Sequence, residues 1–355
     1  MTPLTYSAVA QYKRLSRKRF IIILSLFFSL ILAFMASLCT GSAHVPPLKA
    51  IATLLGRESD FDTIIWEIRL PRALVAVFAG AGLALAGAVT QASVRNPMAS
   101  PFTLGISSAS GFGAALAIVL GAGRFIRTYL GGVTVSSYFL LIISSFLFSL
   151  LATFIIFFLA RFKGATPETI VLTGIAISFL FSALTSFTQY FGTTEQVASI
   201  VFWLFGSLSK ASWNAFWAIF SVSVVALAIF WRWSYKYNAL LLDDEFARNL
   251  GVNPETLRLA SMVLASLVTA TIVSFLGIIA FVCLAAPHIA RMIVGSEHRY
   301  LIPASALVGA NILVLSDIAS RMLLPPVIIP VGIITSFLGA PVLLYLILGK
   351  KRHWY

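Results

Sequence analysis

Long apolar runs separated by short polar segments make up most of this chain. About twenty apolar residues in a helix, at a rise of roughly 1.5 Å each, match the roughly 30 Å of hydrocarbon in a bilayer. The pattern therefore predicts an all-α integral membrane protein with about ten transmembrane helices. The predicted helices cover residues 20–39, 64–92, 102–121, 134–160, 168–190, 212–232, 257–275, 277–294, 302–319 and 330–348.

Two parts of this pattern are irregular. Only Gly277 separates the helices predicted at 257–275 and 277–294, so either their turn is tight or one of them stops short of the far side. A further apolar piece, 197–208, is too short to cross a bilayer. We predict that it forms an amphipathic or re-entrant helix on the outer side.

Small residues recur on one face of the helix predicted at 64–92. Gly80, Ala84 and Gly87 lie at helical spacing, and Gln91 continues the series. Small side chains let helices approach closely in lipid, where no hydrophobic force drives them together. This face is therefore predicted to pack against neighbouring helices.

Basic residues indicate the orientation in the membrane. The first apolar run follows an N-terminal segment, residues 1–19, that contains five Lys and Arg residues, and the run itself has no convincing cleavage site. Such a run is predicted to remain as a span with the N-terminus inside. An even number of helices then returns the C-terminus to the same side, and most of the 25 Lys and Arg residues fall on inner segments. Both termini are predicted to be cytoplasmic.

Composition excludes a water-soluble globule. The chain has 355 residues, of which 59% are hydrophobic and 10% charged, too few polar side chains to cover a soluble surface. The net charge of +13 could indicate nucleic-acid binding, but the basic residues flank apolar runs, which is typical of membrane topology. Both cysteines, Cys39 and Cys283, lie in apolar runs, so neither a disulfide framework nor a zinc site is indicated.

Candidate catalytic chemistry is sparse. Asp317 lies four residues before Arg321, a spacing that predicts a structural ion pair on one helix face. The pair Gly349–Lys350 lacks the residues of a phosphate-binding loop, so any nucleotide is predicted to bind another chain. A membrane enzyme would need clustered His, Asp or Glu, and an ion-driven carrier would need carboxylates in mid-span. Both are alternatives that the sequence does not favour.

The richest cluster of charge is the segment 241–258, LLDDEFARNLGVNPETLR, which is predicted to face the cytoplasm. It predicts a short helix, 243–250, with an acidic start and an apolar side, ended by a C-cap glycine. An acidic front does not suit an anionic membrane surface, so a protein groove is the predicted partner. The residues of this site are Asp243, Asp244, Glu245, Phe246, Ala247, Arg248, Leu250 and Gly251.

Four groups of motifs resemble the FecCD-type permeases of type II ABC importers, which take up iron siderophores, haem and cobalamin. They are RLPR at 69–72 with GAGLALAGAVTQ; RNPMASPFTLGISSA at 95–109; DDEFARNLGV at 243–252; and GIIAFVCLAAPHIAR to GSEHR at 277–299, with SDIASR at 316–321 and PVGIITSFLGAPVLLYLI at 330–347. The resemblance covers residues 66–348, most of the chain.

The resemblance implies a fold, partners and site residues. It implies one transmembrane permease domain over 1–355, without catalytic activity or a cofactor of its own, in the cell membrane. Its partners would be a second permease, identical or a close paralogue, two cytoplasmic ABC ATPases that bind ATP and Mg²⁺, and an extracytoplasmic binding protein. Helix 243–250 would be the coupling helix that enters the ATPase. Arg69, Arg72 and Arg321 would accept glutamates of the binding protein at the outer surface.

The resemblance also implies a pathway and a cargo. The fifth and tenth helices would line the pathway between two permeases, and the loop 161–168 would lie near its cytoplasmic gate. An iron siderophore is the expected substrate. Cobalamin, haem and molybdate are alternatives within the same architecture.

Overall fold

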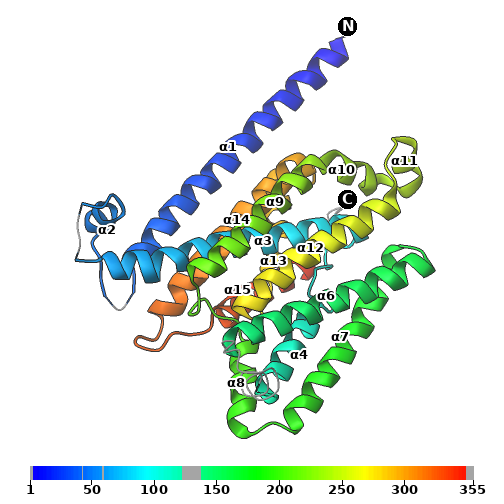
Figure 1. Ribbon diagram of the computed structural model, residues 1–355. Coiled ribbons are helices and arrows are strands. Elements are labelled where there is room, and N and C mark those ends of the chain that lie inside the picture. Colours follow the sequence, from blue (N-terminus) through cyan, green and yellow to red (C-terminus); the bar gives the residue numbers. More distant parts are fainter. Residues whose placement is uncertain (1–2, 42, 58–59, 122–136, 349–355) are drawn as a thin grey trace.

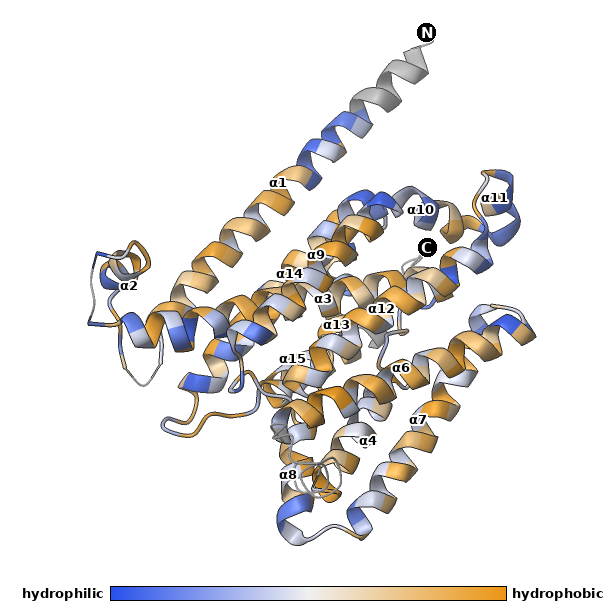
Figure 2. Cartoon of the chain, viewed as in Figure 1, coloured by the Kyte–Doolittle hydropathy of each residue, from blue (hydrophilic) through white to orange (hydrophobic). Residues whose placement is uncertain are grey.

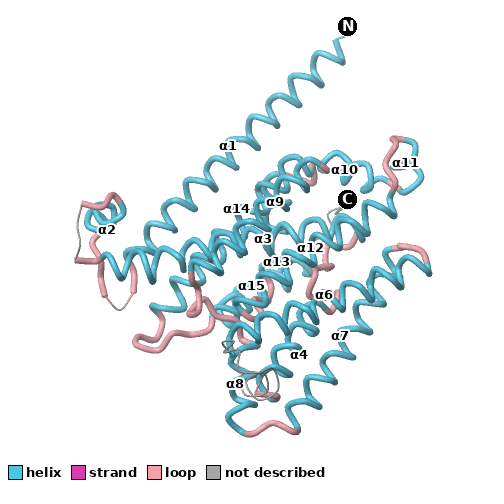
Figure 3. Tube along the Cα trace, in the orientation of Figure 1, coloured by secondary structure: helices cyan, strands magenta, loops and turns pink. Residues whose placement is uncertain are grey.

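The computed structural model describes residues 3–41, 43–57, 60–121 and 137–348, and helices account for most of them (Figures 1 and 3). No strand forms within these ranges, where one isolated antiparallel bridge joins Leu324 and Val327. The helices are α1 (Pro3–Cys39), α2 (Pro47–Leu54), the π-helix η1 (Thr63–Arg69), α3 (Leu70–Val94), α4 (Ile106–Val119), α6 (Ser137–Lys163), α7 (Pro167–Tyr190), α8 (Thr194–Leu204), α9 (Trp213–Arg232), α10 (Ser234–Leu242), α11 (Asp244–Asn249), α12 (Pro254–Leu276), α13 (Val282–Val294), α14 (His298–Met322) and α15 (Val331–Leu348).

Ten apolar helices confirm the predicted membrane fold. Among the described residues, seven helices are long and apolar enough to span a bilayer, and three shorter apolar helices accompany them. Each of the ten overlaps one predicted range. Residues 134–136 of the fourth predicted helix, and the predicted cytoplasmic C-terminus at 349–355, lie outside the described residues.

The irregular parts of the pattern become short helices. Helix α13 has 13 residues and begins after the non-helical segment 277–281, so it is about 20 Å long. Of the two predicted alternatives, a tight turn or a helix that stops short, the structure shows the short helix. Non-helical backbone at membrane depth is tolerated where protein buries it, and Ile279 in this segment is fully buried. The apolar piece predicted at 197–208 forms the short helix α8.

Helix α3 is the centre of the bundle, and it packs against α9, α12, α13 and α14. Its small residues allow two very close crossings. A Cβ atom on Gly80 would lie 2.3 Å from the carbonyl oxygen of Gly309 in α14, and one on Gly87 would lie 1.7 Å from that of Cys283 in α13. The predicted small face of α3 is therefore a helix-packing surface. A second group, α4, α6 and α7, joins the first mainly through α12.

The outer helices present apolar side chains to their surroundings. Figure 2 shows long hydrophobic stretches along α1, α6 and α7. Leu32 in α1 and Phe179 in α7 are each 72% exposed. Exposure of large apolar side chains along whole helices is typical of a surface that faces lipid.

The two ends of α3 define the two ends of the molecule. Arg69 immediately precedes this 25-residue helix, and Arg95 is its left-handed C-cap residue, so the two are separated by about 37 Å of helix. Figure 1 shows α2 beside the first end, and α10 and α11 beside the second. We call these the η1 end and the α11 end.

Candidate functional sites

At the η1 end, the three arginines that the resemblance singles out line one cavity. Arg69 ends η1, Arg72 lies in the first turn of α3, and Arg321 lies in the last turn of α14. The cavity measures about 480 Å³ and also contacts the segment after α1 and the Pro325–Pro326 turn. The fold thus brings together residues that are separated by some 250 positions in sequence.

Asp317 binds two of these arginines. Arg72 donates from Nε and Nη2 to Oδ1 of Asp317, at 2.9 and 2.8 Å, and Nη2 of Arg321 lies 3.0 Å from Oδ2. The carboxylate is fully buried. The predicted Asp317–Arg321 pair is therefore confirmed, and Arg72 is a second partner that helical spacing could not reveal. The second arginine helps to offset the cost of burying the carboxylate.

The remaining donors bind the end of α1. Nη1 of Arg69 donates to the carbonyl oxygen of Leu38 at 2.7 Å, and its Nη2 donates to that of Ala43. Arg321 donates to the carbonyl oxygen of Thr40 at 2.8 Å. No carboxylate of the described residues forms an ion pair with Arg69. Within the described part of the chain, the hydrogen-bond acceptors of Arg69 are therefore neutral carbonyl groups.

Two of the arginines that the resemblance predicts to dock a binding protein are less exposed than expected. Arg69 is 6% exposed and Arg72 is 9% exposed, whereas surface groups were expected. The reason is local: Asp317 binds Arg72, and carbonyl groups in the last turn of α1 and just after it bind Arg69. The cluster of three arginines and one aspartate still carries an excess of positive charge, which favours an acidic ligand or protein surface.

At the α11 end, the predicted short helix is present as α11. Asp243 is its N-cap residue, and its Oδ1 accepts a hydrogen bond from the Asp244 N–H at 2.7 Å. Gly251 adopts a φ of +76°, and its N–H donates to the carbonyl oxygen of Arg248 at 2.9 Å. The predicted start and end of the helix are confirmed to within one residue.

The apolar side chains of α11 point in two directions. Ala247 is fully buried against the bundle, whereas Phe246 and Leu250 are 45% and 59% exposed. The last two are four residues apart and so share a face. Glu245 is also exposed. This face offers a partner two apolar side chains beside a carboxylate.

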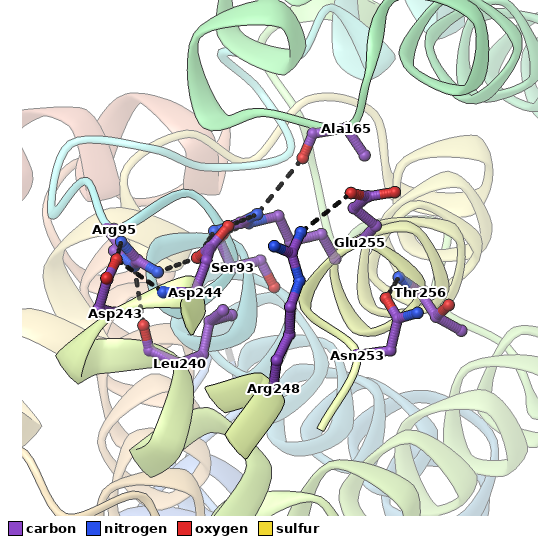
Figure 4. A network of polar contacts seen from close by, with 11 residues as sticks. Ser93, Arg95, Ala165, Leu240, Asp243, Asp244, Arg248, Asn253, Glu255 and Thr256 are labelled. Atoms are coloured by element: carbon purple, nitrogen blue, oxygen red, sulfur yellow. Dashed lines mark hydrogen bonds and ion pairs between the residues drawn. The ribbon is translucent and has the colours of Figure 1, made fainter. Parts of the chain in front are cut away.

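Asp244 points the other way, into a network at the ends of α3 and α12 (Figure 4). Arg258 donates from Nη1 to Oδ2 of Asp244 at 2.7 Å and from Nη2 to Oδ1 at 2.6 Å. Arg95 also donates to Oδ1. The hydrogen bonds from Arg258 lower the pKa of the Asp244 carboxyl below its ordinary value of 3.8. Asp244 is therefore ionised at neutral pH.

Sequence reasoning did not single out Arg95 or Arg258. Both lie beside apolar runs and count as basic residues at the membrane boundary. The sequence did carry a signal for Arg258, because this residue lies beside apolar residues at the start of α12. In the structure its side chain is only 2% exposed. Arg248, by contrast, pairs at 3.3 Å with Glu255, and both are exposed. Such a pair contributes about 1 kcal/mol or less.

An apolar cavity of about 570 Å³ opens on the side of the bundle. It lies between the end of α8, the segment before α13, and α15. It is lined by Leu204, Phe205, Ile278, Ala280, Gly332, Ile333, Ser336, Phe337, Ala340, Pro341 and Leu344. Almost all of these groups are apolar, so the cavity offers a ligand few specific polar contacts.

Ten apolar helices of the described residues, packed about α3 as their small-faced centre, define a multi-pass membrane permease of the type II ABC importer fold. A solved structure described as an inward-facing conformation of a metal-chelate type ABC transporter superposes with a TM-score of 0.78 at 33% identity. The match covers 93% of this chain and 99% of the other. The chain belongs to the FecCD transport family, whose model matches residues 29–349.

The relatives align with this chain over almost its whole length. A Methanocaldococcus jannaschii protein, named as an ABC transporter permease, is 42% identical over 345 residues, which is 97% of this chain and 98% of that protein. The Fe(3+)-citrate import system permease protein YfmE of Bacillus subtilis is 35% identical over 344 residues, 96% of this chain and 98% of the relative. The chain is therefore an ABC importer permease, from a family of transport proteins rather than enzymes.

Proposed function

We propose that this chain is the transmembrane permease subunit that translocates a metal chelate, an iron siderophore, delivered by an extracytoplasmic binding protein. Two relatives support the substrate class, since one is named for Fe(3+)-citrate import and a similar solved structure is described as a metal-chelate transporter. In this proposal the chain performs no chemistry and holds no cofactor. ATP and Mg²⁺ bind two separate cytoplasmic ATPase subunits.

One observation carries the proposal: the two ends of α3 hold sites of different character. The η1 end carries a cavity with three arginines and one aspartate. The α11 end carries a short helix with exposed Phe246 and Leu250. An acidic binding protein suits the first site, and a groove in an ATPase suits the second. Motion of the ATPase at one end would then bias the permease between outward-open and inward-open states.

The second permease subunit would cover the apolar cavity beside α15. Helices α7 and α15 correspond to the fifth and tenth predicted helices, which would line a pathway between two subunits. Phe337 in the cavity wall is 76% exposed in the single chain. An apolar wall would bind a bulky chelate weakly enough to release it. The partner is an identical copy or a close paralogue.

The proposed membrane is the cell membrane, with the N-terminus and the α11 end in the cytoplasm. The alternative of an ion-driven carrier requires a carboxylate free to bind an ion in mid-span. Asp317 is the fully buried carboxylate of the described residues, and two arginines occupy it at the η1 end. The geometry therefore favours the ATP-driven reading.

Reconstitution tests this function directly. The permease, its ATPase and its binding protein are placed in liposomes, and uptake of an iron(III) siderophore is measured with ATP inside. We expect uptake that requires ATP and the binding protein, and that a hydrolysis-deficient ATPase abolishes. Uptake that persists without the ATPase and follows an ion gradient would establish a secondary carrier instead. Competition by cobalamin, haem or molybdate identifies the substrate within the same assay.

A further inference from the structure

The network around Asp244 connects segments that lie far apart in the sequence. Arg258 is almost fully buried, and besides binding Asp244 its Nε donates to the carbonyl oxygen of Ser93 at 2.9 Å. Its Nη1 also lies 3.5 Å from the carbonyl oxygen of Ala165. One guanidinium therefore contacts α11, the end of α3 and the loop that leads into α7.

Arg95 makes a second bridge to the same carboxylate. Its Nε donates to the carbonyl oxygen of Leu240 at 2.8 Å, near the end of α10, while its Nη2 donates to Asp244. Figure 4 shows Arg95 beside Asp243 and Asp244, with Ser93 near Asp244 and with Ala165 further away, joined to the network by the hydrogen bond from Arg258. The end of α3, the end of α10, the start of α12 and the loop before α7 are thus joined to the Asp244 carboxylate through one arginine or the other. We call Asp244, Arg95 and Arg258 the inner network.

The inner network is well suited to transmit a displacement. Paired hydrogen bonds between a guanidinium and a carboxylate are short and directional. Partial burial strengthens such bonds, because the low local dielectric reduces screening. By comparison, α11 itself has six residues and buries one of them, Ala247. A push on so short a helix would reach the bundle mainly through its ionic attachments.

We propose that Asp244 is a positioning residue that transmits the motion of α11 to α3, α12 and the start of α7, and does not itself contact the ATPase. This proposal rests on the proposed function, in which an ATPase grips α11. The two faces of the helix then have separate tasks: Phe246 and Leu250 bind the partner, and Asp244 passes the displacement inward. Helix α7, reached through Ala165, is a wall of the proposed pathway.

The test measures coupling and assembly separately, with the complete complex in liposomes. Coupling is the number of substrate molecules imported per ATP hydrolysed, and assembly is the amount of ATPase that co-purifies with the permease. We expect Asp244→Asn to keep assembly and ATP hydrolysis but to lower coupling by about tenfold, the size of a typical coupling between two sites. Asp244→Glu, which keeps the carboxylate, should retain much of the wild-type coupling. Phe246→Ala should instead reduce assembly.

Glu297→Gln is the matched control. Glu297 is a carboxylate at the start of α14, its side chain is 25% exposed against 30% for Asp244, and it pairs with Arg19 outside the inner network. This variant should couple normally. If Asp244→Asn does not reach the membrane, Arg258→Lys replaces it, because lysine keeps the charge but loses the paired geometry. Arg258→Lys should also lower the number of substrate molecules imported per ATP hydrolysed.

Three outcomes are distinguishable from one another. Unchanged coupling in Asp244→Asn or Arg258→Lys would overturn the proposal while leaving the permease function intact. Loss of assembly in Asp244→Asn, with normal coupling in the remaining complexes, would overturn it by making Asp244 a contact residue. Absence of ATP-driven uptake in the wild-type complex would instead remove the proposed function.

Discussion

Single carboxylates connect distant helices at both ends of this protein. Asp317 binds Arg72 and Arg321 at the η1 end, and Asp244 binds Arg95 and Arg258 at the α11 end. One arginine of each pair belongs to α3: Arg72 lies in its first turn, and Arg95 is its C-cap residue. At the η1 end two arginines on one carboxylate leave an excess positive charge, whereas at the α11 end Asp243 lies 3.6 Å from Arg95 and provides a second carboxylate. The same arrangement thus holds α3 in place from both sides.

Removing the charge of Asp317 should destabilise the permease. Asp317→Asn leaves two largely buried guanidinium groups without a carboxylate, and breaking a buried pair of this kind costs about 3–5 kcal/mol. We expect a clear fall in the temperature at which the detergent-solubilised protein loses its monodisperse peak in gel filtration. Glu67→Gln is the control: Glu67 lies in η1, near the same cavity, but it is exposed. Equal melting of both variants would show that the Asp317 network adds no stability.

At the scale of helices, glycines without side chains let α3 approach α13 and α14 closely enough for backbone to meet backbone. A Cβ on Gly87 would collide with backbone of α13, and a Cβ on Gly80 would collide with backbone of α14. Backbone cannot move aside as the end of a side chain can. Close contact of this kind replaces the hydrophobic force that helices in lipid lack. The crossings of α3 are therefore fixed by two glycines.

Gly87→Ala tests this directly. Overpacking of a tight contact costs about 1–3 kcal/mol or more, so we expect lower yield and a lower melting temperature. Gly111→Ala in α4 is the control, because its added Cβ would meet only the ends of flexible side chains, Cδ2 of Leu204 at 3.0 Å and Cδ1 of Ile278 at 3.8 Å. This change should be nearly neutral, since alanine also favours the helix by up to about 1 kcal/mol. Comparable losses in both variants would contradict the assignment of Gly87 to a fixed crossing.

The sequence predicted elements better than it predicted contacts. Apolar length predicted all ten apolar helices, and the acidic start and Gly251 predicted α11, because these signals are local. The ion-pair partners of Asp244 and Arg72 lie in other segments of the chain. Helical periodicity predicts which residues share a face of one helix, but not which residues of different helices meet. The burial of Arg69 was also missed, because it depends on carbonyl groups at the end of α1 and just after it. Local patterns thus predict elements, whereas tertiary packing decides what each charged group binds.

At the scale of the whole molecule, the positive cavity and α11, the proposed coupling helix, are joined by one continuous helix about 37 Å long. Delivery of substrate at the η1 end and motor motion at the α11 end would both act on α3. In the assembled importer, docking of the binding protein would then be sensed where the ATPase binds. The strength of that docking depends on the charge of the cavity.

Arg69 is the arginine of the cavity best placed to supply that charge, because its partners there are neutral carbonyl groups while Asp317 holds the other two. We expect Arg69→Gln to slow association of the cognate binding protein several-fold at low salt, since steering by charge acts mainly on the association rate. The difference should vanish near 1 M salt, where the Debye length is about 3 Å. Kinetics are measured on permease in nanodiscs. Arg69→Lys keeps the charge and should associate almost normally, and Arg57→Gln removes an exposed charge outside the cavity. An equal loss in Arg57→Gln would show that overall charge, and not this cavity, attracts the binding protein.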